Sequence, residues 1–343
     1  MADIRKRKDD HIDIALTKPV TMTRSAGFDD WEFMHQALPE LDLADVSLET
    51  HFLGHALSAP ILVSSMTGGT ERSGDINRHL AEAVRELGLA MAVGSQRVML
   101  EDPRALPSFA IVREVGPTMP VFGNLGAVQL NYGMGIDQFQ RAREAIRADG
   151  MFIHLNPLQE AIQPEGNTNF SRLLDKIETV ARALPVPLLA KEVGSGIAPD
   201  LAVELTKRQV KAIDVSGAGG TSWAQIEGMR ATDPGRQRLA QIFSNWGIPT
   251  VQSLRLCRDR LPTLPLIASG GIRNGLDAAK ALALGANLIA MAHPLLEPAS
   301  QSTEAVIAAL QQFMLELKVS MFLAGAATIA DLQAKPLWRR DGQ

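Results

Sequence analysis

Short apolar runs alternate with amphipathic stretches along most of the chain. Eight of these runs are largely unbroken by polar residues, as expected for parallel strands that are buried on both faces. Several follow a proline, which suits the entry into a strand. The runs are Pro60–Ser64, Leu89–Val93, Pro120–Gly123, Met151–Leu155, Pro187–Ala190, Ala212–Val215, Pro265–Ala268 and Asn287–Met291.

The segments between these runs have the pattern of helices, with apolar residues three and four positions apart and charged residues between them. They include Ile76–Leu87, Ile136–Ala148, Phe170–Leu184 and Leu276–Leu284. Alternating β and α units indicate a parallel sheet, and eight units are the number that closes a barrel. We therefore expect an α/β fold, a (β/α)8 TIM barrel, with a doubly wound open sheet as the structural alternative.

No linker separates two cores, so we expect one barrel domain over residues 1–343. A strongly charged arm, residues 1–16, precedes it. The spacing of the runs is even except before the seventh, where residues 217–238 form a long polar insertion. An insertion after a barrel strand is typical of a mouth loop or lid rather than of a separate domain.

Composition indicates an ordinary globular protein, with 46% hydrophobic and 21% charged residues and a net charge of -4. This charge gives no global positive field for nucleic acid or an anionic membrane. The one cysteine, Cys257, excludes an intrachain disulfide framework and is expected on a helix. The charged start does not resemble a secretory signal, and Leu282–Leu296, the most apolar stretch, is interrupted by polar residues. We expect a cytoplasmic protein without nucleic-acid or membrane partners.

Polar and glycine residues gather directly after the apolar runs. In a (β/α)8 barrel these positions point into one shared mouth, so we expect them to line a single active site. In chain order they are Ser65, Met66, Thr67, Ser95, Arg97, Asn124, His154, Asn156, Gln159, Glu160, Lys191, Glu192, Ser216–Thr221 and Ser269–Arg273.

The seventh unit gives the sharpest local prediction. A strand, the sequence Ser-Gly-Gly-Ile-Arg at 269–273 and a helix together present backbone N–H groups at a helix N-terminus. Glycines allow an anion to approach closely and the helix dipole favours it, so this segment predicts a phosphate site. A tight turn that needs glycine is the structural alternative. No GxGxxG motif follows a predicted strand, so the sequence gives no indication of a Rossmann dinucleotide site.

Three further groups suit anion chemistry. Lys191 ends an apolar strand, where it forms a Schiff base, stabilises a reduced flavin ring, or pairs structurally with Glu192 or Glu160. The donors beside Glu160 suit a diphosphate held with Mg2+, although a satisfied polar loop explains them equally well. The basic run Arg5–Lys8, with His11, is either a solvated charge cluster or a set of cations folded over the mouth.

Eight motifs together resemble the type 2 isopentenyl-diphosphate isomerases, the FMN-dependent form of that enzyme, from about Arg7 to Leu332. The motifs are RKxxH (Arg7, Lys8, His11), SMTGG, VGSQR, GNLGA, HLNPLQE, KEVGSGI, DVSGAGGTSW and ASGGIRNG. The resemblance implies an FMN-binding TIM barrel. It also implies the interconversion of isopentenyl and dimethylallyl diphosphate in isoprenoid biosynthesis, with reduced FMN, Mg2+ and NAD(P)H as the reductant of the flavin. A homo-oligomer, a tetramer or an octamer, is expected from the resemblance alone.

The resemblance also assigns residues to each ligand. Those implied to contact FMN are Ser65, Met66, Thr67, Ser95, Asn124, Lys191, Ser216, Thr221 and, at its phosphate, Gly270, Gly271, Arg273, Ala292 and His293. Those implied to hold or face the substrate are Arg7, Lys8, His11, Arg97, His154, Asn156, Gln159 and Trp223. Glu160 would bind Mg2+, and Lys191, Gln159 and His154 are the catalytic candidates.

Three rival functions give different expectations. An FMN-dependent 2-hydroxy-acid oxidase needs a histidine base after the sixth strand, where this chain has Ser-Gly-Ala-Gly-Gly-Thr-Ser-Trp. A nucleotide dehydrogenase of the inosinate type needs a nucleophilic cysteine on a mouth loop, whereas Cys257 is expected on a helix. A flavin-storing or scaffold protein would be yellow without turnover.

Overall fold

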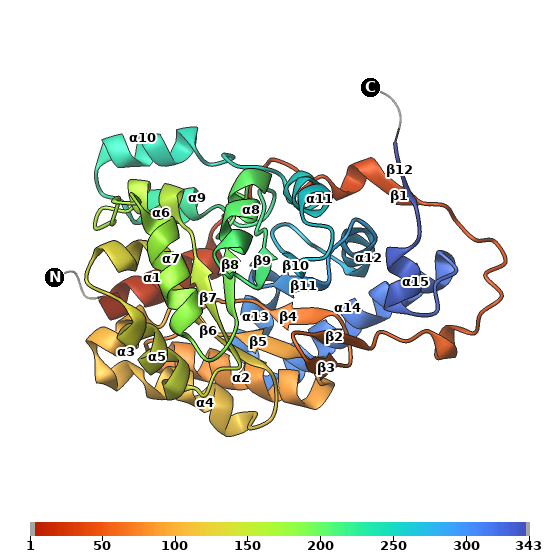
Figure 1. Ribbon diagram of the computed structural model, residues 1–343, viewed down its shortest axis with the longest axis horizontal. Coiled ribbons are helices and arrows are strands. Elements are labelled where there is room, and N and C mark those ends of the chain that lie inside the picture. The colour runs from red at the N-terminus through yellow and green to blue at the C-terminus, as the bar shows by residue number, and fades with distance from the viewer. Residues whose placement is uncertain (1–3, 341–343) are drawn as a thin grey trace.

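Eight parallel strands close into a barrel in the computed structural model, which describes residues 4–340 (Figure 1). The strands follow one another around the barrel in chain order, and the last strand, β11, pairs with the first, β4, to close the ring. They are β4 (Ile61–Val63), β5 (Ala90–Ala92), β6 (Val121–Gly126), β7 (Gly150–His154), β8 (Leu188–Lys191), β9 (Ala212–Asp214), β10 (Leu266–Ala268) and β11 (Leu288–Met291). The TIM-barrel prediction is confirmed, and the open-sheet alternative is excluded because this sheet has no free edge.

Apolar side chains fill the inside of the barrel. Successive residues of a strand point to opposite faces, so alternate positions form an interior cluster. Its members are Leu62, Ala90, Ala92, Phe122, Phe152, Leu189, Ala212, Ile267, Leu288 and Ala290. The hairpin of β2 (Thr50–Phe52) and β3 (His55–Leu57) adds Phe52 and Leu57 to this cluster, with the rings of Phe52 and Phe122 in edge-to-face contact. The interior is therefore a packed core, as in other barrels of this type.

Helices surround the strands. The predicted helices are α2 (Glu71–Leu87), α5 (Ile136–Ala145), α7 (Leu173–Ala183) and α12 (Gly275–Ala283), and α2 begins earlier than expected because Thr70 and Ser73 form a capping box. Arg147 has a positive φ just after the end of α5, and Arg172 has a positive φ just before the start of α7. The remaining outer helices are α3 (Arg97–Glu101), α4 (Pro107–Val115), α8 (Pro199–Lys207), α11 (Thr250–Arg260), α13 (His293–Gln301), α14 (Thr303–Leu323) and α15 (Ile329–Gln333).

The arm and the insertion both lie beside the barrel mouth (Figure 1). The arm forms α1 (Ile4–Thr17), which contacts α9 and α13, and residues 1–3 of the predicted arm lie outside the described residues. The insertion contains α9 (Trp223–Arg230) and α10 (Pro234–Ile242), and α6 (Pro157–Ile162) packs against α9. This segment is largely helical, and α10 extends past residue 238 to Ile242.

The helix α14 corrects one expectation from composition. The sequence shows no unbroken apolar run of the length needed to span a membrane, yet α14 is long and apolar enough to do so by length and composition. Its most apolar window is 28% buried within the chain. The face carrying Val306, Leu310 and Leu317 packs against the outer layer, where α14 contacts α2, α12 and α13. These contacts are those of an outer barrel helix.

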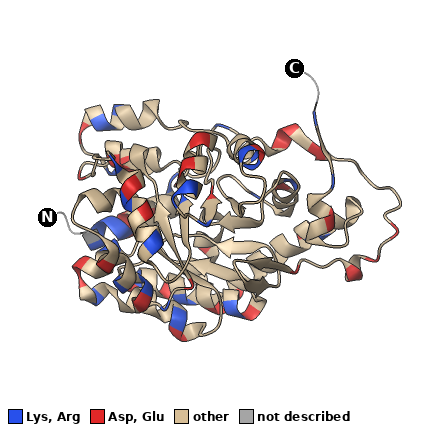
Figure 2. Cartoon of the chain, viewed as in Figure 1, with Lys and Arg blue, Asp and Glu red and all other residues tan. Residues whose placement is uncertain are grey.

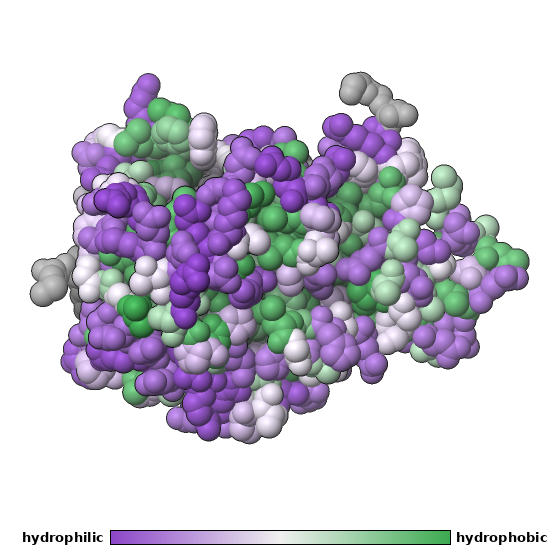
Figure 3. Space-filling model, in the orientation of Figure 1, coloured by the Kyte–Doolittle hydropathy of each residue, from purple (hydrophilic) through white to green (hydrophobic). Residues whose placement is uncertain are grey.

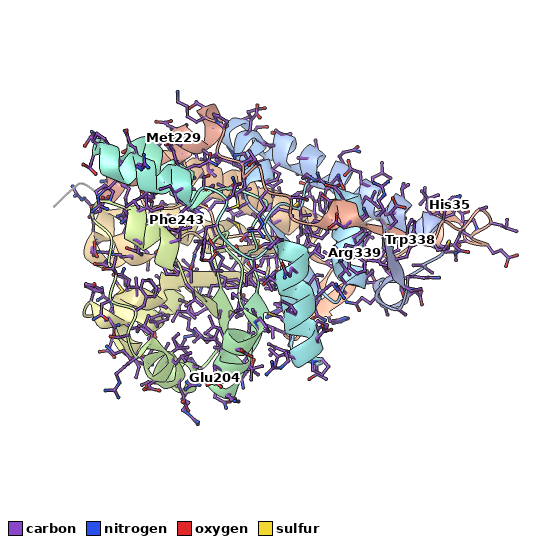
Figure 4. The ribbon with its side chains drawn as sticks, turned by 90° about the horizontal axis from the view of Figure 1, so that it is seen from above. His35, Glu204, Met229, Phe243, Trp338 and Arg339 are labelled. Carbon is purple, nitrogen blue, oxygen red and sulfur yellow. The ribbon has the colours of Figure 1, made fainter. Side chains whose placement is uncertain are left out.

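Small elements extend the molecule away from the mouth. The strand β1 (Trp31–Phe33) pairs with β12 (Leu337–Arg339), and the guanidinium carbon of Arg255 lies 4.6 Å from the centre of a Trp31 ring. The short 3-10 helices are Phe28–Asp30, Leu43–Asp45, Pro103–Ala105 and Ala127–Asn131. Figure 4 shows Trp338, Arg339 and His35 at one end of the molecule, and Met229 and Phe243 of the insertion toward the other.

The outer surface is mixed in charge and polarity. Figure 2 shows acidic and basic residues interspersed over the outer helices, and Figure 3 shows mostly hydrophilic side chains with scattered apolar ones. An exposed apolar group lies on and around α10, where Ile242 and Trp246 are 62% and 60% exposed. Buried polar residues, in contrast, gather at the mouth of the barrel, among them Asn124, Lys191 and Asp214.

Candidate active site

A polar layer lies directly above the apolar core of the barrel. Continuing the alternation of most strands by two residues leads from interior apolar residues to polar ones, for example from Leu189 to Lys191 and from Ala212 to Asp214. The interior-facing residues of this layer are Ser64, Asn124, His154, Lys191, Asp214 and Ser269. The barrel interior thus changes from apolar to polar at the C-terminal ends of six of the eight strands, whereas β5 and β11 continue to Gly94 and Ala292.

A cavity of about 480 Å³ opens above this layer. Its size is ordinary for a site that takes a cofactor and a small molecule. Every residue that the resemblance assigns to a ligand lines it, from Arg7 on α1 to His293 at the start of α13, whereas Glu192, Gly217 and Ala218 of the predicted strand exits do not. The strand ends converge because the barrel is closed, which is why residues spread over most of the chain meet in one place.

The glycine turn after β10 packs backbone to backbone with the loop after β9. Gly270 and Gly271 have φ values of +93° and +73°, and a Cβ on Gly270 would lie 2.1 Å from the carbonyl oxygen of Gly217. The helix that follows, α12, is capped by the side chain of Asn274, whereas α13 has no side-chain cap at Ala292. Of these two helices, α13 therefore presents the N-terminus without a side-chain cap to the cavity, next to the glycine turn.

The side chains of Arg273 and His293 stand at this end of the cavity. The guanidinium of Arg273 donates to Asp277 at 2.9 Å and to Asp29 at 2.8 Å, which fixes its direction. The Nε2 atom of His293 lies 3.0 Å from the carbonyl oxygen of Ala15 at the end of the arm. The end predicted to bind phosphate thus contacts the N-terminal helix through His293.

Lys191 is buried in the polar layer and is not part of the side-chain ion pair that the sequence left open. Its Nζ donates to the backbone carbonyl of Glu192 at 2.7 Å. The Glu192 carboxylate instead accepts the backbone N–H groups of Val193 and Gly194 at 2.6 and 2.7 Å and also that of Ser195. Burial lowers the pKa of Lys191 and raises that of Glu192 to about 7.

His154 is a neutral imidazole. Burial, followed by the charges of Lys191 and Lys8, lowers its pKa to about 3. Its Nδ1 lies 2.8 Å from the Oδ1 of Asn124, which can only accept a hydrogen bond, so Nδ1 carries the proton and Nε2 is an acceptor. His154 therefore offers the cavity a lone pair and no charge.

The segment after β7 forms a connected amide and carboxylate group. Asn156 donates to Gln159 Oε1 at 3.1 Å and to Glu160 Oε1 at 3.0 Å, and the other oxygen of Glu160 accepts the Asn167 N–H at 2.6 Å. The Oδ1 atom of Asn156 is buried and has no hydrogen-bond partner. Glu160 is also buried, so this group presents a carboxylate beside an unsatisfied amide oxygen.

The arm folds over the mouth and brings part of its basic run into the cavity, while Lys6 is exposed. Arg7, Lys8 and His11 all line the cavity. Arg7 pairs with Glu165 at 3.5 Å, while burial, followed by the charge of Arg7, lowers the pKa of Lys8 to about 8. The arm therefore places cations where an anionic ligand would enter.

Sequence reasoning missed Glu227, which holds the arm and the mouth together. Its side chain is fully buried and pairs with His11 at 3.0 Å and with Arg230 at 2.5 Å. Gln159 also donates to it, at 2.9 Å. Burial would raise the pKa of Glu227, but the hydrogen bond and charge of His11 and its other partners hold it at about 2. Glu227 follows the predicted site residue Trp223 by four positions, so the two share a helix face, and this spacing could have predicted that Glu227 lies near the mouth.

Comparison with known proteins identifies the family. Residues 137–339 match the model of the FMN-dependent dehydrogenase family. The chain is 50% identical over 329 residues to isopentenyl-diphosphate delta-isomerase of Pseudescherichia vulneris, covering 96% of this chain and 95% of the relative. It is 47% identical to the enzyme of that name from Stutzerimonas stutzeri, covering 95% of each, and 45% identical to that from Rickettsia peacockii, covering 95% of each.

Solved structures support the fold. Lactate oxidase of Pediococcus acidilactici is similar with a TM-score of 0.70 and 17% identity, over 100% of this chain and 96% of that one. A mandelate oxidase variant gives a TM-score of 0.70 and 19% identity, over 98% and 99% of the two chains. At 17% and 19% identity these likenesses concern the fold alone. The chain is an enzyme that belongs to the FMN-dependent, type 2 family of isopentenyl-diphosphate delta-isomerases.

Proposed function

We propose that this enzyme interconverts isopentenyl diphosphate and dimethylallyl diphosphate, using reduced FMN and Mg2+, as a step of isoprenoid biosynthesis. The names of its relatives support the reaction. The observation that carries the proposal is one cavity lined by two groups of residues that are suited to anions. One is the glycine turn with the uncapped α13, and the other is the group of cations on the arm and at Arg97. A flavin phosphate and a substrate diphosphate would need two such groups.

The residues around the cavity fit FMN. The hydroxyl oxygens of Ser65 and Thr67 are buried without a hydrogen-bond partner, at positions that the resemblance assigns to the flavin. Gly270 and Gly271 with α13 would hold the phosphate, and Lys191 would face the ring. When bound in its reduced form, FMN would supply an electron-rich ring and an exchangeable proton next to the double bond of the substrate. No net electrons move in the isomerisation, so NAD(P)H would serve only to reduce FMN.

The group after β7 fits Mg2+ in the way that diphosphate enzymes use it. Within residues 4–340 no group of three or more His, Cys, Asp or Glu side chains is placed to hold a metal by itself. Mg2+ often keeps several waters and binds one or two carboxylates together with substrate phosphates. Glu160 would be the carboxylate ligand, and the unsatisfied Oδ1 of Asn156 faces the same region.

The protein's part in the reaction is orientation and electrostatics. An alkene is a poor base, so its protonation requires a nearby acid and a dry site in which fixed charges act strongly. The arm covers the mouth and limits water, while Arg7, Lys8 and Arg97 would bind the diphosphate and convert remote binding energy into orientation. Gln159 cannot titrate, and Glu227 and Asn156 fix its amide, so it would position the substrate or relay a proton.

Anaerobic turnover tests the function. Purified protein, FMN, Mg2+ and isopentenyl diphosphate are mixed with and without a reductant, and dimethylallyl diphosphate is measured. We expect product only in the reduced sample, and its absence there would reject the assignment. Lys191→Ala should lose most of the activity and change the spectrum of the reduced flavin; full activity in that variant would remove Lys191 from the mechanism. Oxidation of lactate or glycolate by the protein would favour the oxidase alternative.

Two further properties stay predictions. We propose a homo-oligomer, a tetramer or an octamer, for which the exposed apolar residues around α10, such as Ile242 and Trp246, offer contact area. Light scattering coupled to gel filtration measures the mass, and a monomer would contradict the proposal. Cytoplasmic location is a proposal that cell fractionation tests.

A further inference from the structure

Asp214 is a buried acid in the polar layer of the barrel with no role in the proposed reaction. Its side chain is fully inaccessible to solvent. One carboxylate oxygen, Oδ1, accepts the hydroxyl of Ser269 at 2.6 Å and the backbone N–H of Ser216 at 3.1 Å. The other oxygen, Oδ2, is buried and has no hydrogen-bond partner. A buried carboxylate with an unsatisfied oxygen is costly, so a cationic neighbour is expected.

That neighbour is Lys191. The ladder between β8 and β9 places Lys191 directly opposite Asp214, and the alternation of both strands directs the two side chains to the barrel interior. The two residues therefore stand side by side in the layer on which FMN would lie. Their side chains are within electrostatic reach of each other, and Asp214 is the first of the charges that oppose the effect of burial on Lys191.

The other titratable groups around Lys191 do not replace Asp214. His154 faces it from β7 and is neutral, and Lys8 above the mouth has the same charge as Lys191. Glu192 is adjacent in the chain, but its carboxylate is occupied by three backbone N–H groups of the following loop. Among the carboxylates described here around Lys191, Asp214 is the one that presents an unsatisfied oxygen.

We propose that Asp214 is the positioning residue that acts on the flavin through Lys191, by favouring the charged form of its amine beside the ring. The inference rests on the proposed binding of FMN. Burial disfavours the charged form of both groups, because it lowers the pKa of Lys191 and raises that of Asp214, and the charge of each residue opposes this effect on the other. A charged Lys191 lowers the pKa of the reduced ring and so maintains it as an anion. Asp214 thus acts on the cofactor through Lys191 and does not contact it directly.

The direction in which Asp214→Asn shifts the pKa of the reduced flavin separates this proposal from a direct effect of the Asp214 charge on the flavin. Replacing Asp214 by Asn removes a negative charge, which by itself would lower the pKa of the reduced flavin. If Asp214 keeps Lys191 charged, Lys191 loses its proton in the variant, and the pKa of the reduced flavin rises by roughly one unit or more. Asn has the same shape and still accepts from Ser269 and Ser216, so the local hydrogen bonds survive.

The experiment is a pH titration of the absorption spectrum of the reduced flavin in FMN-loaded protein. The variants are Asp214→Asn, Lys191→Met and the double variant, with Asp149→Asn as a control. Asp149 is a carboxylate at the opposite end of the barrel, where it binds Arg113 and the N–H of Val121. We expect both Asp214→Asn and Lys191→Met to raise the flavin pKa, with the larger rise in Lys191→Met because it retains the negative charge of Asp214, and Asp149→Asn to leave it unchanged.

The double variant keeps the test decisive if Asp214→Asn alone does not fold, because it removes both charges together. Without the ammonium group, Asp214 can act only through its own negative charge, so the flavin pKa of the double variant should lie above that of the unsubstituted protein and at or below that of Lys191→Met. A lowered or unchanged flavin pKa in Asp214→Asn, or a flavin pKa in the double variant above that of Lys191→Met, would overturn the inference. Failure of the unsubstituted protein to bind FMN is a distinct result, because it would overturn the proposed function and, with it, this inference.

Discussion

The alkaline limit of activity should be set by Lys8. This residue lies on α1 over the mouth, beside Arg7, and lines the cavity that the diphosphate would enter. Burial, followed by the charge of Arg7, lowers its pKa from 10.5 to about 8. Below pH 8 the free enzyme therefore carries an ammonium group at this position, and above pH 8 it carries a neutral amine. A neutral amine cannot pair with a diphosphate.

The size of the effect follows from that pKa. The protonated fraction of Lys8 falls roughly tenfold between pH 7 and pH 9, and kcat/KM for isopentenyl diphosphate should fall with it. Stability moves in the opposite direction. A lysine whose pKa is lower in the folded than in the unfolded protein binds fewer protons when folded, so the free energy of unfolding gains from this group as pH rises from about 8 to 10.5. The loss of activity is therefore not the onset of unfolding.

The assay measures initial rates at low substrate concentration from pH 6.5 to 9.5, with FMN fully reduced and Mg2+ saturating. Lys8→Arg keeps its charge throughout this range, so the alkaline decline should disappear or move to higher pH. Lys6→Arg is the matched control, because Lys6 lies on the same helix but is exposed, and the decline should remain. A decline that persists unchanged in Lys8→Arg, or a flat profile in the unsubstituted enzyme, would refute the reasoning.

Three other substitutions test separate parts of the structure. Gly270→Ala should abolish FMN retention, because its Cβ would meet a backbone oxygen at 2.1 Å, whereas Gly133→Ala has a similar φ of +90° but open space and should retain FMN; equal flavin-to-protein absorbance ratios would contradict this. Glu227→Gln should lower kcat/KM roughly tenfold or more, because His11 and Gln159 lose their charged partner, and unchanged kinetics would show that the contact is unimportant. Arg113→Met should lower the free energy of unfolding in urea by about 3 kcal/mol, because it leaves several buried carbonyl groups without a donor; a loss under about 1 kcal/mol would contradict this.

The sequence alone predicted the barrel and the contents of its mouth. Eight unbroken apolar runs matched eight strands, because strands buried on both faces need apolar residues at every position. The polar residues after those runs, such as Lys191 and Glu160, could be assigned to one cavity for a topological reason. In a closed parallel barrel all strand C-termini lie at the same end, so residues that directly follow different strands are expected close together in space.

Only the tertiary structure decided how these residues are paired and charged. Glu227 pairs with His11 and Arg273 pairs with Asp29, and the two residues of each pair lie far apart in the sequence. No local sequence pattern therefore predicts either contact. Whether the arm is solvated or closes the mouth depends on such long-range partners, which also determine burial. Because burial and the nearest charges set the pKa of Lys8, His154 and the other buried groups, their protonation could not be read from residue type and spacing.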